Sequence, residues 1–150
     1  KVLGAMGEDG TIVWHDGPPV DEAVRRDAET KARAAMEDEL RSLRGARSMG
    51  PTGDRPIVVV TDGLSTPPTA LVAARALSRL GPRQLLLAAP IASAEAVAAV
   101  EPQYDRVVCV DTLVLEDDLA WYEHDRLPSD RDARAFFDVS SSETEVAHEA

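Results

Sequence analysis

The chain has 150 residues, a formal net charge of −11 and 44% hydrophobic residues, few of which are aromatic. This length suits one domain with a single core. The acidic charge argues against nucleic acid as a partner, because phosphate backbones require a basic surface. No apolar run approaches the roughly 20 residues of a membrane span, so no membrane contact is expected.

Cysteine and lysine usage give two further expectations. Cys109 is the single cysteine, so an internal disulfide is excluded; we expect a buried structural thiol and a reducing, cytoplasmic environment. Lys1 and Lys31 are the two lysines. An acidic, lysine-poor surface fits adaptation to high salt. The base composition of a GC-rich genome predicts the same residues, and both explanations remain open.

A β-hairpin is predicted at the start of the chain. Two short apolar runs, residues 2–6 and 11–14, flank the turn Gly-Glu-Asp-Gly at residues 7–10. This pattern is typical of a hairpin. His15 follows the second run, and we expect a solvated side chain at a strand end rather than a ligand contact.

A long helix is predicted next. Asp21 is a suitable N-cap, and Glu22 places an acidic charge in the first turn. Alanine, methionine and leucine then recur at helical spacing and form a thin apolar stripe among many charges. The helix is expected to end near Arg44, because Gly45 follows.

Residues 56–81 organise the rest of the chain. The β-branched run at residues 57–60 predicts a buried parallel strand, and residues 69–80 carry apolar side chains at helical spacing. Between them lie Asp62, Gly63 and a turn rich in hydroxyl groups and proline. A carboxylate beside hydroxyl groups and a helix N-terminus suits a phosphorylated sugar, with the phosphate at the helix and sugar hydroxyls on the acid.

Two more strands and a helix are predicted after this segment. Residues 84–89 and 106–110 are apolar runs of buried-strand character, and Ser93 is a suitable cap for a helix over residues 94–100. Residues 90–93 are expected to form a loop. The order of elements predicts an α/β fold: a parallel sheet with flanking helices, preceded by the hairpin. Ligands in such sheets bind at the carboxyl ends of the strands.

Asp111 and Thr112 are expected just beyond the third strand, at that binding edge. Trp121 and Tyr122 follow a short acidic stretch, and we expect them to cover an exposed edge of the core.

Ser129 begins a predicted last helix over residues 130–137. The expected domain spans residues 1–137, and residues 138–150 form a polar, acidic tail that is expected to fray.

The segment at residues 56–81 resembles the loop that binds phosphoribosyl pyrophosphate (PRPP) in type I phosphoribosyltransferases. In that family an apolar strand is followed by two acidic residues and then by Gly-x-x-Thr-Gly-x-Thr/Ser. Asp62, Gly63, Thr66 and Thr69 match this motif. The resemblance extends to residues 3–13 and 81–97 and covers most of residues 1–137.

The resemblance implies a transferase that moves phosphoribose from PRPP to an unidentified acceptor. It makes Asp62 the candidate catalytic residue, which would hold the ribose hydroxyls. Gly63, Ser65, Thr66 and Thr69 become the candidate phosphate-binding residues. Mg²⁺ is implied by the resemblance alone, and no metal ligands are predicted in the chain. By the same resemblance, the aromatic pair near residue 121 would lie close to the site, where a ring can stack on a base.

The sequence departs from the family at the loop itself. Thr61 replaces the first acid, and Pro67 replaces the second glycine, with Pro68 beside it. Proline has no N–H to offer a phosphate, so both prolines remove candidate donors. Alternatively, the prolines simply start the helix well. The alternative function is therefore a non-catalytic binding or regulatory module that has lost PRPP chemistry, and a purely structural domain is a third interpretation.

The family's pyrophosphate-binding loop and first parallel strand have no counterpart in this sequence, so the chain is expected to lack the N-terminal part of the family's domain. An unpaired sheet edge would result, which must be covered. We expect a homo-oligomer or the missing segment to cover it.

Overall fold

A computed structural model describes residues 3–43 and 51–113, together with the separate positions 129, 132 and 135. Along the chain the elements are β1 (Gly4–Met6), β2 (Ile12–Trp14), α1 (Glu22–Leu43), β3 (Ile57–Val60), α2 (Pro68–Ser78), β4 (Leu85–Ser93), α3 (Ala94–Val100), a short 3-10 turn η1 (Glu101–Gln103) and β5 (Arg106–Leu113).

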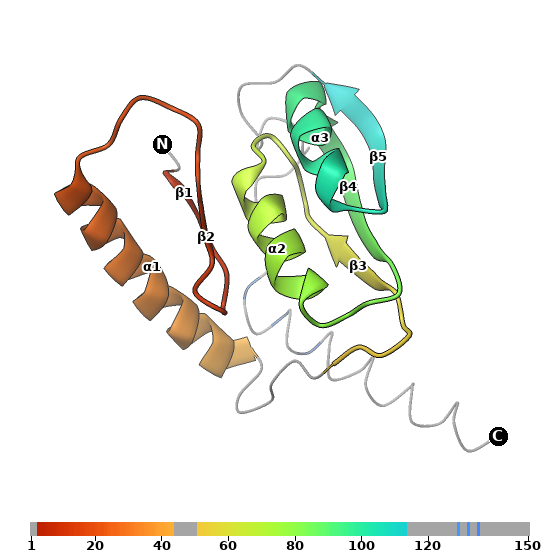
Figure 1. Cartoon of the computed structure of the whole chain (residues 1–150), viewed down its shortest axis with the longest axis horizontal. Coiled ribbons are helices and arrows are strands. Elements are labelled where there is room, and N and C mark those ends of the chain that lie inside the picture. The colour runs from red at the N-terminus through yellow and green to blue at the C-terminus, as the bar shows by residue number, and fades with distance from the viewer. Residues whose placement is uncertain (1–2, 44–50, 114–128, 130–131, 133–134, 136–150) are drawn as a thin grey trace.

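The central unit is a parallel sheet in the order β3-β4-β5. Helices α2 and α3 connect successive strands and lie on one face of the sheet (Figure 1). Crossovers of the same hand between neighbouring strands place both helices on the same side. The predicted α/β fold, with a parallel sheet, flanking helices and an N-terminal hairpin, is confirmed.

The core lies between the sheet and these two helices. Leu85, Leu87 and Ala89 alternate along β4 and are buried, as is Val100 at the end of α3. Tyr104 follows η1, is 8% exposed, and donates its hydroxyl proton to the carbonyl of Ala70 at 2.7 Å. Burial raises the pKa of Tyr104 to about 12. Small and medium aliphatic side chains therefore fill this core, with one aromatic residue tying α2 to the edge of the sheet.

The other face of the sheet is open in the described part of the chain. Val58 and Val60 of β3 are 54% and 75% exposed, and Val108 and Val110 of β5 are 44% and 86% exposed. We call the surface formed by these four side chains the valine face. Parallel sheets are ordinarily covered on both faces, so this surface needs an explanation.

The predicted hairpin forms and docks on α2. Strands β1 and β2 pair antiparallel, and Val13 of β2 is buried. At the turn, Asp9 accepts hydrogen bonds from the amide and hydroxyl of Thr11, both at 2.9 Å, and pairs with Arg79 at the C-cap of α2. The backbone hydrogen bond from Thr11 is the main reason that the pKa of Asp9 lies below its usual range.

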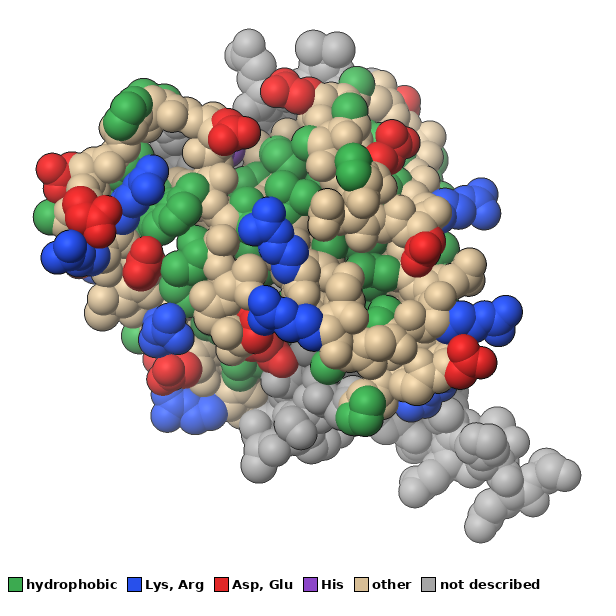
Figure 2. Space-filling model, viewed as in Figure 1, with side chains coloured by type: hydrophobic (Ala, Val, Ile, Leu, Met, Phe, Trp, Pro, Cys, Tyr) green, Lys and Arg blue, Asp and Glu red, His purple; other side chains and the backbone are tan. Residues whose placement is uncertain are grey.

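The long helix α1 begins where its cap predicts. The carboxylate of Asp21 accepts a hydrogen bond from the amide of Ala23 at 2.7 Å. The helix runs beside the hairpin, and none of its residues is buried. Figure 2 shows acidic and basic side chains interspersed along it. Arg25 links the helix to the hairpin, because its guanidinium lies 5.0 Å from the centre of the Trp14 ring.

Two predicted boundaries are wrong. Residues 90–93 are not a loop, because β4 continues to Ser93, and Asp111 and Thr112 lie within β5 rather than beyond it. Ile91 and Ala92 pair with these two residues in register. The wrong prediction of a loop at residues 90–93 comes from Pro90, because proline is common in turns. A proline is tolerated where the ladder needs no N–H from that position, and the register of β4 with β5 has no pair at Pro90.

No helix among the described residues is long and apolar enough to cross a membrane. Ser129 donates to the carboxylate of Asp132 at 2.6 Å, and positions 132 and 135 are helical. The rest of that predicted helix, Trp121, Tyr122 and the boundary between residues 137 and 138 lie outside the described residues.

Candidate functional site

The hydroxyl of Thr61 and hydrogen bonds to the last residues of β4 hold the loop after β3 in place. Thr61 donates its hydroxyl proton to the carbonyl of Gly63 at 2.8 Å, which closes a tight turn around Asp62. Leu64 is 3% exposed and forms a parallel bridge with Ala92. Its amide donates to the carbonyl of Ile91 at 3.0 Å. These contacts attach the loop to the end of β4.

Ser93 supports the same loop from the sheet. Its hydroxyl donates to the carbonyl of Ser65 at 3.1 Å and accepts from the amide of Ala96 at 3.1 Å, where it caps α3 as predicted. One side chain thus joins the start of α3 to the candidate loop. Sequence reasoning assigns Ser93 to the cap and to the loop expected at residues 90–93, and it treats Thr61 as the replacement of an acid. A hydroxyl residue directly before Asp-Gly is, however, a signal for a side-chain-stabilised turn.

Helix α2 begins at the end of this loop. Pro67 is its N-cap residue and Pro68 its first residue, so α2 starts one residue before the predicted Thr69. Pro68 is fully buried. No side chain caps this end, and the amides of a helix's first turn have no partner within the helix. The amides of Thr69 and Ala70 are therefore the first donors that α2 presents, and the two prolines present none.

A cavity of ≈ 330 Å³ opens between this loop and the edge of β3. All five residues chosen from the sequence line it: Asp62, Gly63, Ser65, Thr66 and Thr69. The structure therefore brings one carboxylate, three hydroxyl groups and the N-terminus of α2 to one hollow, at the carboxyl end of β3. Their roles in binding remain predictions.

A second hollow of ≈ 540 Å³ is lined by residues of β2, the loop, α2 and α3. Ser65 and Thr66 line both hollows. His15 also lines the second one, and one of its ring nitrogens lies 2.8 Å from the carbonyl of Asp16. The prediction of His15 as a solvated residue at a strand end missed this proximity, because no sequence signal places the hairpin beside the loop.

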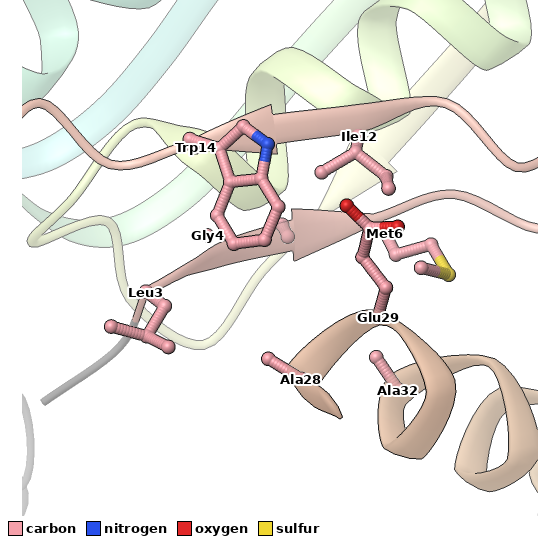
Figure 3. Close-up of a pocket in the computed structure, with 9 residues that line it drawn as sticks. Leu3, Gly4, Met6, Ile12, Trp14, Ala28, Glu29 and Ala32 are labelled. Carbon is pink, nitrogen blue, oxygen red and sulfur yellow. The ribbon is translucent and has the colours of Figure 1, made fainter. Parts of the chain in front are cut away.

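A third hollow of ≈ 310 Å³ separates the hairpin from α1 and contains none of the predicted site residues. Figure 3 shows Leu3, Met6 and Trp14 of the hairpin region above Ala28 and Ala32 of the helix. The short alanine side chains leave the space between the two elements unfilled. Apart from Glu29, the residues that line this hollow are apolar, so it offers little to orient an anionic ligand.

Comparisons with known proteins bear on this site. No known family profile matches the chain. Two curated proteins of Mycobacterium tuberculosis are similar to it: "Putative phosphoribosyl transferase MT0597" of strain CDC 1551 and "Putative phosphoribosyl transferase Rv0571c" of strain H37Rv. Each is 32% identical over 117 residues, which is 75% of this chain and 26% of the relative. The chain thus spans about a quarter of the length of these relatives.

A solved structure is also similar. The crystal structure of TT1426 from Thermus thermophilus matches with a TM-score of 0.61 and 25% sequence identity, over 89% of this chain and 65% of that one. This likeness agrees with the α/β fold described above.

Proposed function

We propose that this chain carries the phosphoribosyl-binding part of a PRPP-dependent transferase whose acceptor is unidentified. One observation carries the proposal: the cavity that gathers Asp62 and the hydroxyls of Ser65, Thr66 and Thr69 at the N-terminus of α2. Sequence similarity to proteins named as phosphoribosyl transferases supports the same interpretation.

Each group has a distinct role in this proposal. The carboxylate of Asp62 accepts hydrogen bonds from the ribose hydroxyls. The hydroxyls of Ser65, Thr66 and Thr69 donate to the 5′-phosphate, and the first amides of α2 add two further donors. Thr61 does not replace the missing acid, because its hydroxyl is engaged with the carbonyl of Gly63.

The reaction needs no covalent intermediate on the protein. A nitrogen of the acceptor forms a bond to the anomeric carbon as the bond from that carbon to pyrophosphate breaks. Pyrophosphate leaves with the electron pair, and the acceptor nitrogen loses its proton to solvent. The protein's contribution is to position the phosphoribosyl group and to stabilise the charge that develops.

The residues that line the cavity would hold Mg²⁺ only together with the phosphates of the substrate. Among the described residues that line the cavity beside the loop, Asp62 is the one carboxylate. Within residues 3–43 and 51–113, no cluster of three or more His, Cys, Asp or Glu side chains is arranged to hold a metal. Mg²⁺ commonly binds through one or two carboxylates, waters and substrate phosphates. Asp62 would contact such an ion, which neutralises charge on the leaving pyrophosphate.

The start of α2 favours a second candidate, a binding or regulatory module without catalysis. Pro67 and Pro68 offer no N–H to a phosphate. A hydrogen bond to a charged group contributes roughly 1.5 to 3 kcal/mol. If both positions are phosphate donors in active relatives, the loss here is about 3 to 6 kcal/mol, or roughly two to four decades in affinity. Such a module would bind phosphorylated sugars weakly and turn none over.

The test compares two aspartates at opposite ends of β3. Calorimetric titration with Mg²⁺-PRPP is expected to show at least about tenfold weaker binding for Asp62→Asn. Asp54→Asn, at the exposed turn before the strand, serves as the matched control and should bind like the unaltered chain. Equal affinities for all three proteins would contradict the proposal. Binding without pyrophosphate release, across a panel of nitrogen-containing bases, would favour the module.

A further inference from the structure

One edge of the hairpin has no strand beside it in the described part of the chain. The sheet of β1 and β2 has two strands, and the amide of His15 donates toward β1, to the carbonyl of Leu3 at 2.9 Å. Hydrogen-bonded positions alternate along an antiparallel strand, so Ile12 and Trp14 turn their N–H and C=O groups away from β1. This free edge of β2 can therefore pair with a further strand.

The free edge of β2 borders the second hollow, which residues 12–16 line together with parts of the loop, α2 and α3. We call this hollow of ≈ 540 Å³ the edge groove. Side chains alternate between the two faces of a strand. Val13 is buried, and Figure 3 shows Ile12 and Trp14 on the face toward α1. Ile12 and Trp14 therefore contribute their backbone to the edge groove.

The helices give the edge groove an apolar lining. Pro68 and Leu71 of α2 and Ala96 and Ala99 of α3 line it, and Pro68 and Ala96 are fully buried. The short alanine side chains leave room for an extended backbone between β2 and α3. Every second side chain of a strand in this place would contact the apolar lining.

Opposite charges lie at the two ends of the edge groove, which Asp16, Arg75 and Glu95 also line. Asp9 of the hairpin turn pairs with Arg79 at the C-terminal end of α2, so β2 runs from there toward the start of α2. Asp16 therefore lies at the end opposite Arg75. Glu95 is in the first turn of α3, which is joined to the loop before α2. Among the described residues, neither Arg75 nor Glu95 has an ion-pair partner.

We propose that the edge groove binds a short extended peptide as a third, antiparallel strand of the hairpin. Hydrogen bonds to the backbone of Ile12 and Trp14 supply affinity, and alternate apolar side chains on the lining supply specificity. The antiparallel direction places the cationic N-terminal end of the peptide beside Asp16 and Glu95. It places the anionic C-terminal end beside Arg75.

Length and packing favour a short peptide over a second copy of the chain. From Pro68 to Arg75, α2 rises about 12 Å, a distance that about four extended residues span. The β2 strand of a second copy is held between its own α1 and α2, so that copy would have to bring both helices into the groove. A peptide titration needs no PRPP, so its outcome is independent of the proposed function.

A peptide designed for this register tests the proposal. In Lys-Val-Thr-Val-Glu the lysine lies opposite Asp16, the threonine lies opposite Trp14, and both valines face the apolar lining. Calorimetric titration of the full chain should show saturable binding below millimolar peptide. N-methylation of the threonine amide, which points at β2, should weaken binding at least about tenfold. N-methylation of the second valine amide, which points away from β2, is the matched control and should weaken binding less than about threefold.

Two results of this titration would overturn the proposal. One is no binding at millimolar peptide, and the other is an equal loss of affinity from the two N-methylated peptides. Light scattering adds a third: a dimer of the chain that excludes the peptide would assign the free edge of β2 to a second copy.

A substitution at the rim tests the direction of the peptide. Arg75→Glu should weaken binding of Lys-Val-Thr-Val-Glu at least about threefold and should strengthen binding of Lys-Val-Thr-Val-Lys. Arg83→Glu, at an exposed arginine outside the groove, is the matched control and should leave both affinities unchanged. Equal effects of the two substitutions would contradict the antiparallel placement.

Discussion

Pro67 is the residue at which the candidate site differs most consequentially from a phosphate-binding loop. As the N-cap residue of α2 it stands where a glycine could aim its amide at a ligand, and the carbonyl of Pro67 still accepts the amide of Leu71 at 3.0 Å. Nothing in the helix itself requires a proline here, since glycine is also tolerated at an N-cap position.

Pro67→Gly should therefore raise the affinity for PRPP. The substitution adds one donor, which is expected to strengthen binding about ten- to a hundredfold, and the measurement is a calorimetric titration with Mg²⁺-PRPP. Pro82→Gly, just beyond the other end of α2, is the matched control and should leave affinity unchanged. If Pro67→Gly also has no effect, the phosphate does not bind at this helix end.

The candidate site residues could be predicted from the sequence because they lie close together along the chain. Asp62, Gly63, Thr66 and Thr69 lie within eight positions of one another, so strand, turn and helix bring them together without help from distant segments. The place of His15 at the second hollow and the hydrogen bond from Ser93 to Ser65 depend instead on how the hairpin and β4 are placed. Spacing along the chain carries no information about such long-range neighbours, so the sequence does not reveal the bond from Ser93 to Ser65 or the hollow beside His15.

At the scale of elements, Tyr104 links α2 to the edge of the sheet. Its ring is buried in the core cluster and its hydroxyl bonds to α2 through Ala70. Because burial raises the pKa of Tyr104 to about 12, an unfolded chain, in which tyrosine titrates near pH 10, loses this proton first as pH rises.

This pKa difference predicts a loss of stability in alkali. The stabilisation is fully present below about pH 10 and falls by up to about 1.4 kcal/mol per pH unit as pH rises toward 12. Tyr104→Phe should cost about 1 kcal/mol at neutral pH, from the lost hydrogen bond, and should remove this part of the alkaline slope. Urea unfolding at pH 7, 10 and 11 provides the measurement, and an unchanged slope would contradict the assignment.

Element order and type could be predicted, but several boundaries could not. The hairpin, α1 and α3 have local signals at their ends: a Gly-rich turn, Asp21 and Ser93. Strand β4 has a misleading signal, because Pro90 suggests a turn while pairing of Ile91 and Ala92 with β5 continues the strand. That pairing is a long-range contact, which periodicity within β4 does not encode.

At the scale of the whole molecule, the main open question is what covers the exposed apolar face of the sheet. The parallel sheet has three strands among the described residues, and its valine face is exposed. The apolar runs predict buried strands without showing which layer covers each face. The expectation of a homo-oligomer or a further segment at the sheet edge stays a prediction. This chain spans 26% of the length of its sequence relatives.

The central claim, that the loop from Asp62 to Thr69 holds a phosphoribosyl group, is tested most directly by titrating the unaltered chain with Mg²⁺-PRPP at low salt and in molar KCl. We predict saturable binding of one PRPP per chain below millimolar concentration. It should persist in KCl, because salt also screens the repulsion between the ligand and a chain of net charge −11. No binding at millimolar PRPP in either condition would contradict the claim.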